Sequence, residues 1–166
     1  MGGIDSGRIG LLEAIKRFTA ESTNELIMPV RIQKKDEEQT YRSANVYLMR
    51  LPDSKSVFKK APYVLHQLIT AQDRQSPGQR PASTALVRSI FCVYNKDEQE
   101  GGLMLLNLME RLRIAMERKI VIENRYKLLL DPAVEALIYP EDSAPYYAGE
   151  MVSTWKIPAI EREVTL

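Results

Sequence analysis

The side chains that most often carry chemistry are scarce in this 166-residue chain, which contains one histidine and one cysteine. His66 stands in an apolar stretch of strand length, with no nucleophile close to it in sequence. An imidazole in such a place is more often a satisfied core residue than a general base. Cys92 lies between Phe91 and Val93, which favours a small core side chain over a reactive thiolate. We therefore expect both residues to be structural.

Metal and phosphate sites are not predicted either. With one histidine and one cysteine, a single chain cannot assemble the usual nitrogen and sulfur ligands of zinc. The acidic runs at residues 36–38 and 97–100 lack the alternating ligands and central glycine of a calcium loop, so they are interpreted as solvated turns. Gly101 and Gly102 are not followed by the lysine of a phosphate-binding loop and are interpreted as helix entry. We expect no catalytic residue, no metal and no cofactor.

Charged residues suggest interaction surfaces rather than active sites. The densest basic cluster lies within residues 111–125, where glutamates are interleaved with the arginines, and this favours a solvated helix face over a nucleic-acid site. Arg74 and Arg80 lie in a polar segment, residues 72–84, whose only acid is Asp73. A segment of this length is either a plain exposed loop or an interaction arm.

Aromatic residues gather near the C-terminal end of the chain. Core packing is the first explanation of Trp155. Tyr146 and Tyr147, which lie close to a proline and a glycine, are divided between core packing and subunit contact because amphipathic rings suit interfaces. The candidate protein-interaction residues are therefore Arg74, Arg80, Tyr146, Tyr147 and Trp155.

Two amphipathic helices are predicted to support these residues. The first covers residues 6–23, and Asp5 or Ser6 could cap it by accepting a backbone hydrogen bond. Its predicted buried face contains Ile9, Leu12, Ile15 and Thr19, with Leu11 and Phe18 at the edges. The second covers residues 101–119, and its predicted buried face contains Leu105, Leu108, Met109, Leu112, Ala115 and Met116.

Apolar or alternating segments predict the strands, which are expected at residues 26–32, 46–51, 63–70, 85–94, 126–130, 133–139 and 151–157. Pro29 would confine the first of these to a sheet edge. Residues 85–94 are nearly equally apolar on both faces, which predicts a central strand covered on both sides. Residues 151–157 alternate as a half-buried strand does. Residues 34–44 and 72–84 remain as extended polar loops.

The order of these elements predicts one α+β domain over residues 1–166. A mainly antiparallel sheet would pack against the N-terminal helix and the long amphipathic helix. Composition agrees with a globular domain, at 45% hydrophobic and 27% charged residues, and the net charge of +1 gives no overall field toward nucleic acid or membrane. Neither a secretory signal nor a long apolar run is found, so we expect a soluble intracellular protein.

Four segments resemble small neck and tail-completion proteins of tailed bacteriophages. They are the helix at residues 103–119, the turn between residues 125 and 132, the entry at residues 145–151 and the ending at residues 155–163. Within that group the chain resembles the tail terminator family of phages and phage-tail-like particles of Gram-positive bacteria. The resemblance covers roughly residues 85–163 and, more weakly, the first helix. Its motifs are structural rather than catalytic.

The resemblance implies a non-enzymatic α+β subunit that assembles with its own copies into a ring, expected to be a hexamer. Such a ring caps the last ring of tail tube protein and then offers a surface to a neck or head-completion protein; in contractile tails it also touches sheath protein. The expected location is the virion tail or a phage-tail-like particle, and the host bacterial cytoplasm during assembly. Neither a membrane nor sequence-specific nucleic acid is an expected partner.

Two other functions remain open at this point. One is a head-completion or other minor neck protein, which belongs to the same structural class. The other is a small nucleic-acid-binding regulatory domain that uses residues 111–125, for which a steep salt dependence of DNA binding would be diagnostic.

Overall fold

Two helices and nine strands form an α+β domain in the computed structural model, which describes residues 7–32, 34–52, 60–140 and 143–160. The elements in chain order are α1 (Arg8–Thr23), β1 (Met28–Pro29), β2 (Tyr41–Arg42), β3 (Asn45–Leu48), β4 (Tyr63–Arg74), β5 (Ala82–Tyr94), α2 (Glu98–Lys119), β6 (Val121–Ile122), β7 (Tyr126–Leu129), β8 (Glu135–Ile138) and β9 (Tyr146–Ile157). The predicted α+β class with a mainly antiparallel sheet is confirmed.

The main sheet has the strand order β3-β4-β5-β9-β7-β6, and β8 pairs with β9 as well. Among the described strands only β3 and β4 pair in parallel. The far edge of β9 is shared, since β7 pairs with residues 154–156 and β8 with residues 149–152. The sheet therefore ends in β3 on one side and in β8, β7 and β6 on the other.

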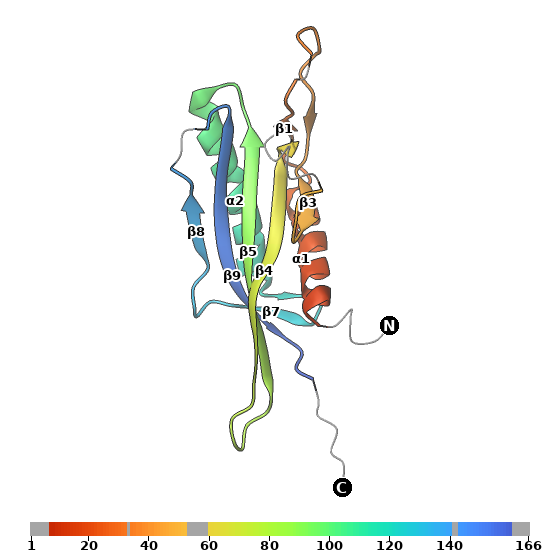
Figure 1. Cartoon of the computed structure of the whole chain (residues 1–166), viewed down its shortest axis with the longest axis vertical. Coiled ribbons are helices and arrows are strands. Elements are labelled where there is room, and N and C mark those ends of the chain that lie inside the picture. The colour runs from red at the N-terminus through yellow and green to blue at the C-terminus, as the bar shows by residue number, and fades with distance from the viewer. Residues whose placement is uncertain (1–6, 33, 53–59, 141–142, 161–166) are drawn as a thin grey trace.

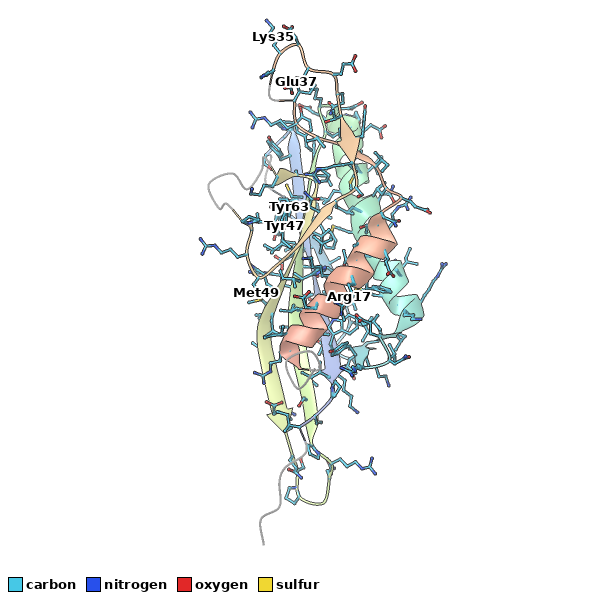
Figure 2. The ribbon with its side chains drawn as sticks, turned by 90° about the vertical axis from the view of Figure 1, so that its right-hand side faces the viewer. Arg17, Lys35, Glu37, Tyr47, Met49 and Tyr63 are labelled. Atoms are coloured by element: carbon cyan, nitrogen blue, oxygen red, sulfur yellow. The ribbon has the colours of Figure 1, made fainter. Side chains whose placement is uncertain are left out.

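Both helices lie on the same face of this sheet (Figures 1 and 2). The α1 helix packs over β3 and β4, whereas α2 packs over β5 and β9. The main hydrophobic core fills the space between the helices and the sheet. No described helix covers the opposite face, so the structure is layered on one side only.

The buried face of α2 follows the predicted helical spacing. Its fully buried side chains are Leu105, Leu108, Met109, Leu112 and Met116, while Ala115 is half-buried. The helix begins one turn earlier than predicted because Asp97 caps it, and the Asp97 side chain accepts a hydrogen bond from the Gln99 amide at 2.9 Å.

The buried face of α1 was predicted less well. Leu11 and Ile15 are buried as the centre of the face, whereas Ile9 is 57% exposed and was wrongly placed inside. At 3.6 residues per turn Ile9 lies on the opposite side of the helix from Leu11, so the two cannot share one narrow face. Gly7 occupies the N-cap position without a side-chain cap bond. The predicted caps Asp5 and Ser6 lie outside the described residues.

The predicted central strand is β5, which lies between β4 and β9. Phe91 and Val93 point into the main core. On the other face Cys92 and Tyr94 join a second, smaller cluster with Leu51, Ala61, Tyr63 and Leu65. Side chains on both faces of β5 are therefore buried only at its end near Tyr94, so the predicted cover on both sides holds for that part of the strand alone.

The first polar segment contains more structure than predicted, and the first strand contains less. Of residues 26–32 only Met28 and Pro29 form a strand, which pairs with Tyr41 and Arg42 inside the predicted loop at residues 34–44. The guanidinium of Arg42 explains this order, because it donates to the carbonyls of Ser43, Lys60 and Pro62. The polar composition of residues 34–44 gave no sign that Arg42 attaches this segment to the domain.

We predict that the buried face of α2 determines the stability of the domain. Leu108→Ala and Leu112→Ala should each lower the free energy of unfolding by about 2–5 kcal/mol, because both side chains are 0% exposed and each substitution leaves a cavity. Leu103→Ala on the same helix is the control, since Leu103 is 63% exposed. Urea unfolding measures all three, and equal midpoints for the buried and exposed variants would show that the helix is oriented differently.

Candidate functional site

The segment at residues 72–84, called the arm below, is the most prominent projection of the molecule. β4 and β5 continue through it, with Gln72 opposite Thr84 and Arg74 opposite Ala82. The predicted thirteen-residue loop is therefore wrong, and only residues 75–81 form the turn. Figure 1 shows this hairpin extending past the rest of the domain. Backbone ladder bonds need no apolar side chains, which is why the polar sequence concealed the strands.

Local geometry accounts for where the arm begins and turns. The register of β4 against β5 shifts between Leu68 and Thr70, which leaves Ile69 as a bulge at the base of the arm. Bulges increase the twist of a strand pair. At the tip Gly78 has a φ of 75°, which favours glycine, and the Gln79 amide donates to the Ser76 carbonyl at 3.0 Å.

The arm presents positive charge to solvent. Asp73 is already occupied, because Arg8 bonds it at 2.8 Å and the Ser83 hydroxyl donates to it at 2.6 Å. Arg74 and Arg80 are exposed and form no salt bridge within the described part of the chain. The two predicted interaction arginines thus lie on one projecting element and keep their charges available to a partner.

The predicted aromatic residues do not join the arginines in one site. Trp155 is 0% exposed, and its indole Nε1 donates to the Ser153 hydroxyl at 2.9 Å, so its assignment as an interaction residue is wrong. Tyr146 and Tyr147 are half-buried at the other end of β9. The Tyr146 ring packs on Tyr94 with centroids 5.5 Å apart. The length of the twelve-residue strand β9 therefore separates these two tyrosines from Arg74 and Arg80 on the arm.

Tyr147 explains the paired glycines at the start of α2. A Cβ on Gly101 would lie 2.1 Å from the Tyr147 ring, whereas a Cβ on Gly102 would meet nothing within 4 Å. Gly101 is therefore required by close packing of the helix on β9, which is a different reason from the predicted helix entry.

His66 belongs to a buried polar chain that the sequence did not reveal. Its Nε2 is 2.8 Å from the Thr19 hydroxyl and its Nδ1 is 2.7 Å from the Ser89 hydroxyl. Since Thr19 donates its single hydroxyl hydrogen to the Ile15 carbonyl, it accepts from Nε2–H, and Ser89 donates to Nδ1. Ser89 lies opposite His66 across β4 and β5, a contact that only the strand register could have predicted.

This chain of groups fits a structural role. All three side chains are buried, so no solvent-borne substrate reaches the serine. Burial lowers the pKa of His66 to about 3, which keeps the imidazole neutral at physiological pH. The histidine thereby links α1 to the sheet through two satisfied hydrogen bonds.

Cys92 likewise lies in a packed environment. It is fully buried in the smaller cluster, where burial raises the pKa of the thiol to about 12 and a hydrogen bond with Tyr63 acts in the opposite direction. Burial also raises the pKa of Tyr63. The thiolate is strongly disfavoured, so the interpretation of Cys92 as a core residue agrees with its surroundings.

Within the basic cluster at residues 111–125, Arg113 is the residue that acids match, while Arg118, Lys119 and Arg125 are exposed. Arg113 bonds both Glu110 and Glu117 at 2.6 Å, and Glu123 is paired with Arg17 of α1. Hydrogen bonds to Glu110 and Glu117 raise the pKa of Arg113. The arrangement agrees with the predicted solvated face of α2. Within the described residues, no group of three or more histidine, cysteine, aspartate or glutamate side chains is placed to hold a metal.

A second surface feature is β8, which the sequence predicts as a short edge strand but not as an interaction surface. All four residues of β8 are exposed, including Leu137 at 55% and Ile138 at 45%. Its one pairing partner among the described strands is β9, so the outer edge of β8 is open to solvent. The only signal in the sequence was an apolar Leu-Ile pair, which resembles any short core strand.

No protein-family model matches the chain, and no curated protein matches its sequence. Neither helix in the described part of the chain is long and apolar enough to cross a bilayer.

We predict that His66 makes the folded state sensitive to acid. Its folded pKa of about 3 lies below the ordinary value of 6.5, so between these values only the unfolded chain binds the proton. Stability is therefore fully present above pH 6.5 and is lost as the pH falls toward 3, with a loss of about 2 kcal/mol between pH 7 and pH 5.

Urea unfolding at both pH values measures this loss, and His66→Gln should remove it. An NMR titration of the folded protein should also find no imidazole ionisation above about pH 4. The same loss in the glutamine variant would assign the acid sensitivity to other groups.

Proposed function

We propose that this chain is a structural subunit of a phage tail or phage-tail-like particle, in which it acts as the tail terminator. Its copies form a ring that caps the finished tail tube and offers a surface to the neck or head. The resemblance of residues 85–163 to the tail terminator family is one support for this proposal. The arm is the observation that carries it.

An arm of this kind is suited to reach another molecule. Residues 72–80 are exposed along their whole length, so they add little to the burial that stabilises the domain. A projecting polar hairpin that is not needed in the core of its own subunit is available to contact a partner. Arg74 and Arg80 would pair there with carboxylates of the tube protein, which adjusts association rate and register more than raw affinity.

The two ends of the molecule would then meet different partners. The arm projects at one end, whereas the β1–β2 hairpin and the start of α2 lie at the other end (Figure 1). A cap needs such polarity, because one surface meets the tube and the opposite surface meets the neck. The same polarity suits a head-completion or minor neck protein, and binding to isolated tubes distinguishes the terminator from these.

We predict that the arm is required for capping and dispensable for folding. Residues 75–81 are replaced by a two-residue Asn-Gly turn, which joins Arg74 to Ala82 in the observed register. The variant should keep its thermal midpoint because the removed turn has almost no buried area. Tails assembled with it should lose their uniform length, as measured by electron microscopy.

Charge variants separate the role of the arginines from that of the backbone. Arg74→Glu combined with Arg80→Glu should slow binding to tubes, whereas Lys35→Glu, an exposed cation in the segment between β1 and β2, should have little effect. For the variant in which residues 75–81 are replaced, tails of normal length would show that the arm only connects β4 to β5.

A further inference from the structure

The open edge of β8 has a defined set of free backbone groups. The Tyr139 amide donates to the Ala148 carbonyl at 3.1 Å, which fixes the alternation of the β8–β9 ladder. The backbone amides and carbonyls of Glu135 and Leu137 therefore face β9, whereas those of Ala136 and Ile138 point away from it. No described group bonds these outward amides and carbonyls.

The opposite end of the sheet has a matching edge. The amide of Asn45, at the start of β3, donates to the carbonyl of Pro62 just before β4, and the amide of Met49, just after β3, donates to the carbonyl of His66 in β4. The alternate amides of Val46 and Leu48 consequently point away from the sheet. Figure 2 looks onto this margin, with Tyr47 and Met49 labelled. Among the described residues, β3 and β8 thus each present amides that no backbone carbonyl accepts, although the Leu48 carbonyl already accepts from the Arg50 amide at 2.7 Å.

Strand directions decide how two such edges would meet. β3 is parallel to β4, β4 is antiparallel to β5, β5 to β9, and β9 to β8. β8 therefore runs opposite to β3 within one subunit. Rotation about an axis close to the strand direction preserves that relation, so β8 of one copy and β3 of the next would pair antiparallel.

Charge supports the same arrangement. Antiparallel pairing brings the start of β8, with Glu135, beside the end of β3, which Arg50 follows. Both side chains are exposed and neither forms a salt bridge within the described residues. When Ala136 lies opposite Leu48, Ile138 lies opposite Val46, and the exposed apolar area of Leu137 and Ile138 becomes covered.

We infer that the subunits join edge to edge, with β8 of one copy adding to β3 of its neighbour, so that the sheet continues around the ring. This inference rests on the proposed function, which requires a ring, and it adds which strands make the contact. Exposed edges readily accept another strand, and a head-to-tail contact between identical chains closes into a ring when the rotation closes.

Blocking one outward amide tests the contact. Ala136→Pro removes an amide that faces the neighbour and leaves the bonds to β9 in place, a position where an edge strand tolerates proline. Ala136→Ser keeps the amide and is the control. Native mass spectrometry should find the ring for the wild type and the serine variant, and monomers for a proline variant with an unchanged thermal midpoint.

Paired cysteines test the register independently. In a Cys92→Ala background, Leu137→Cys together with Tyr47→Cys should give a ladder of disulfide-linked oligomers under mild oxidation, while each single variant stays monomeric on a denaturing gel. Linked dimers from Leu137→Cys alone would instead indicate two-fold pairing of β8 with itself and would overturn the inference.

The outcomes separate this inference from the function on which it rests. If the ring persists in Ala136→Pro and the paired-cysteine variant gives no ladder, the edge contact is contradicted. The terminator role is then left intact. A wild-type chain that is monomeric at every concentration, together with a paired-cysteine variant that yields no ladder, contradicts both.

Discussion

The hydrogen-bonded ladders on both sides of β5 are the constraint on which the rest of the structure depends. β5 pairs with β9 from Ser83 to Tyr94 and with β4 over nearly the same length. This register directs Phe91 toward the helices and Cys92 toward the smaller cluster. A slip of one residue would exchange those two faces. The same ladder extends the arm and holds β9, whose far edge supports β7 and β8.

Patterns that depend on neighbours in sequence could be predicted, and those that depend on register could not. Helical spacing identified the buried face of α2 around Leu108, and alternation identified the buried side of β9. The contact between His66 and Ser89 requires knowledge of which residues of β4 and β5 face each other. Trp155 was counted as an interaction residue because composition cannot distinguish an aromatic core from an aromatic surface. The arm was missed as strand because hydrophobicity says little about an exposed ladder.

The domain is asymmetric in two directions, and both bear on assembly. Across the sheet, the helices cover one face and leave the other with half-buried side chains such as Arg88 and Glu150. Along the strands, the arm at one end differs from the start of α2 at the other (Figure 1). Copies could join laterally through the β3 and β8 edges of the sheet. The arm, which projects at one end of the strands, would then reach toward the tube. This division of surfaces is the basis of the proposed ring.

Electron microscopy of tail tubes, with and without the purified chain, determines whether the protein caps them. We expect a ring of this protein bound at one end of each tube, with the arms directed toward the tube and the tube no longer able to grow. Tubes that keep bare, growing ends in excess protein would contradict the terminator role, because a terminator assembles on the tube and stops its growth.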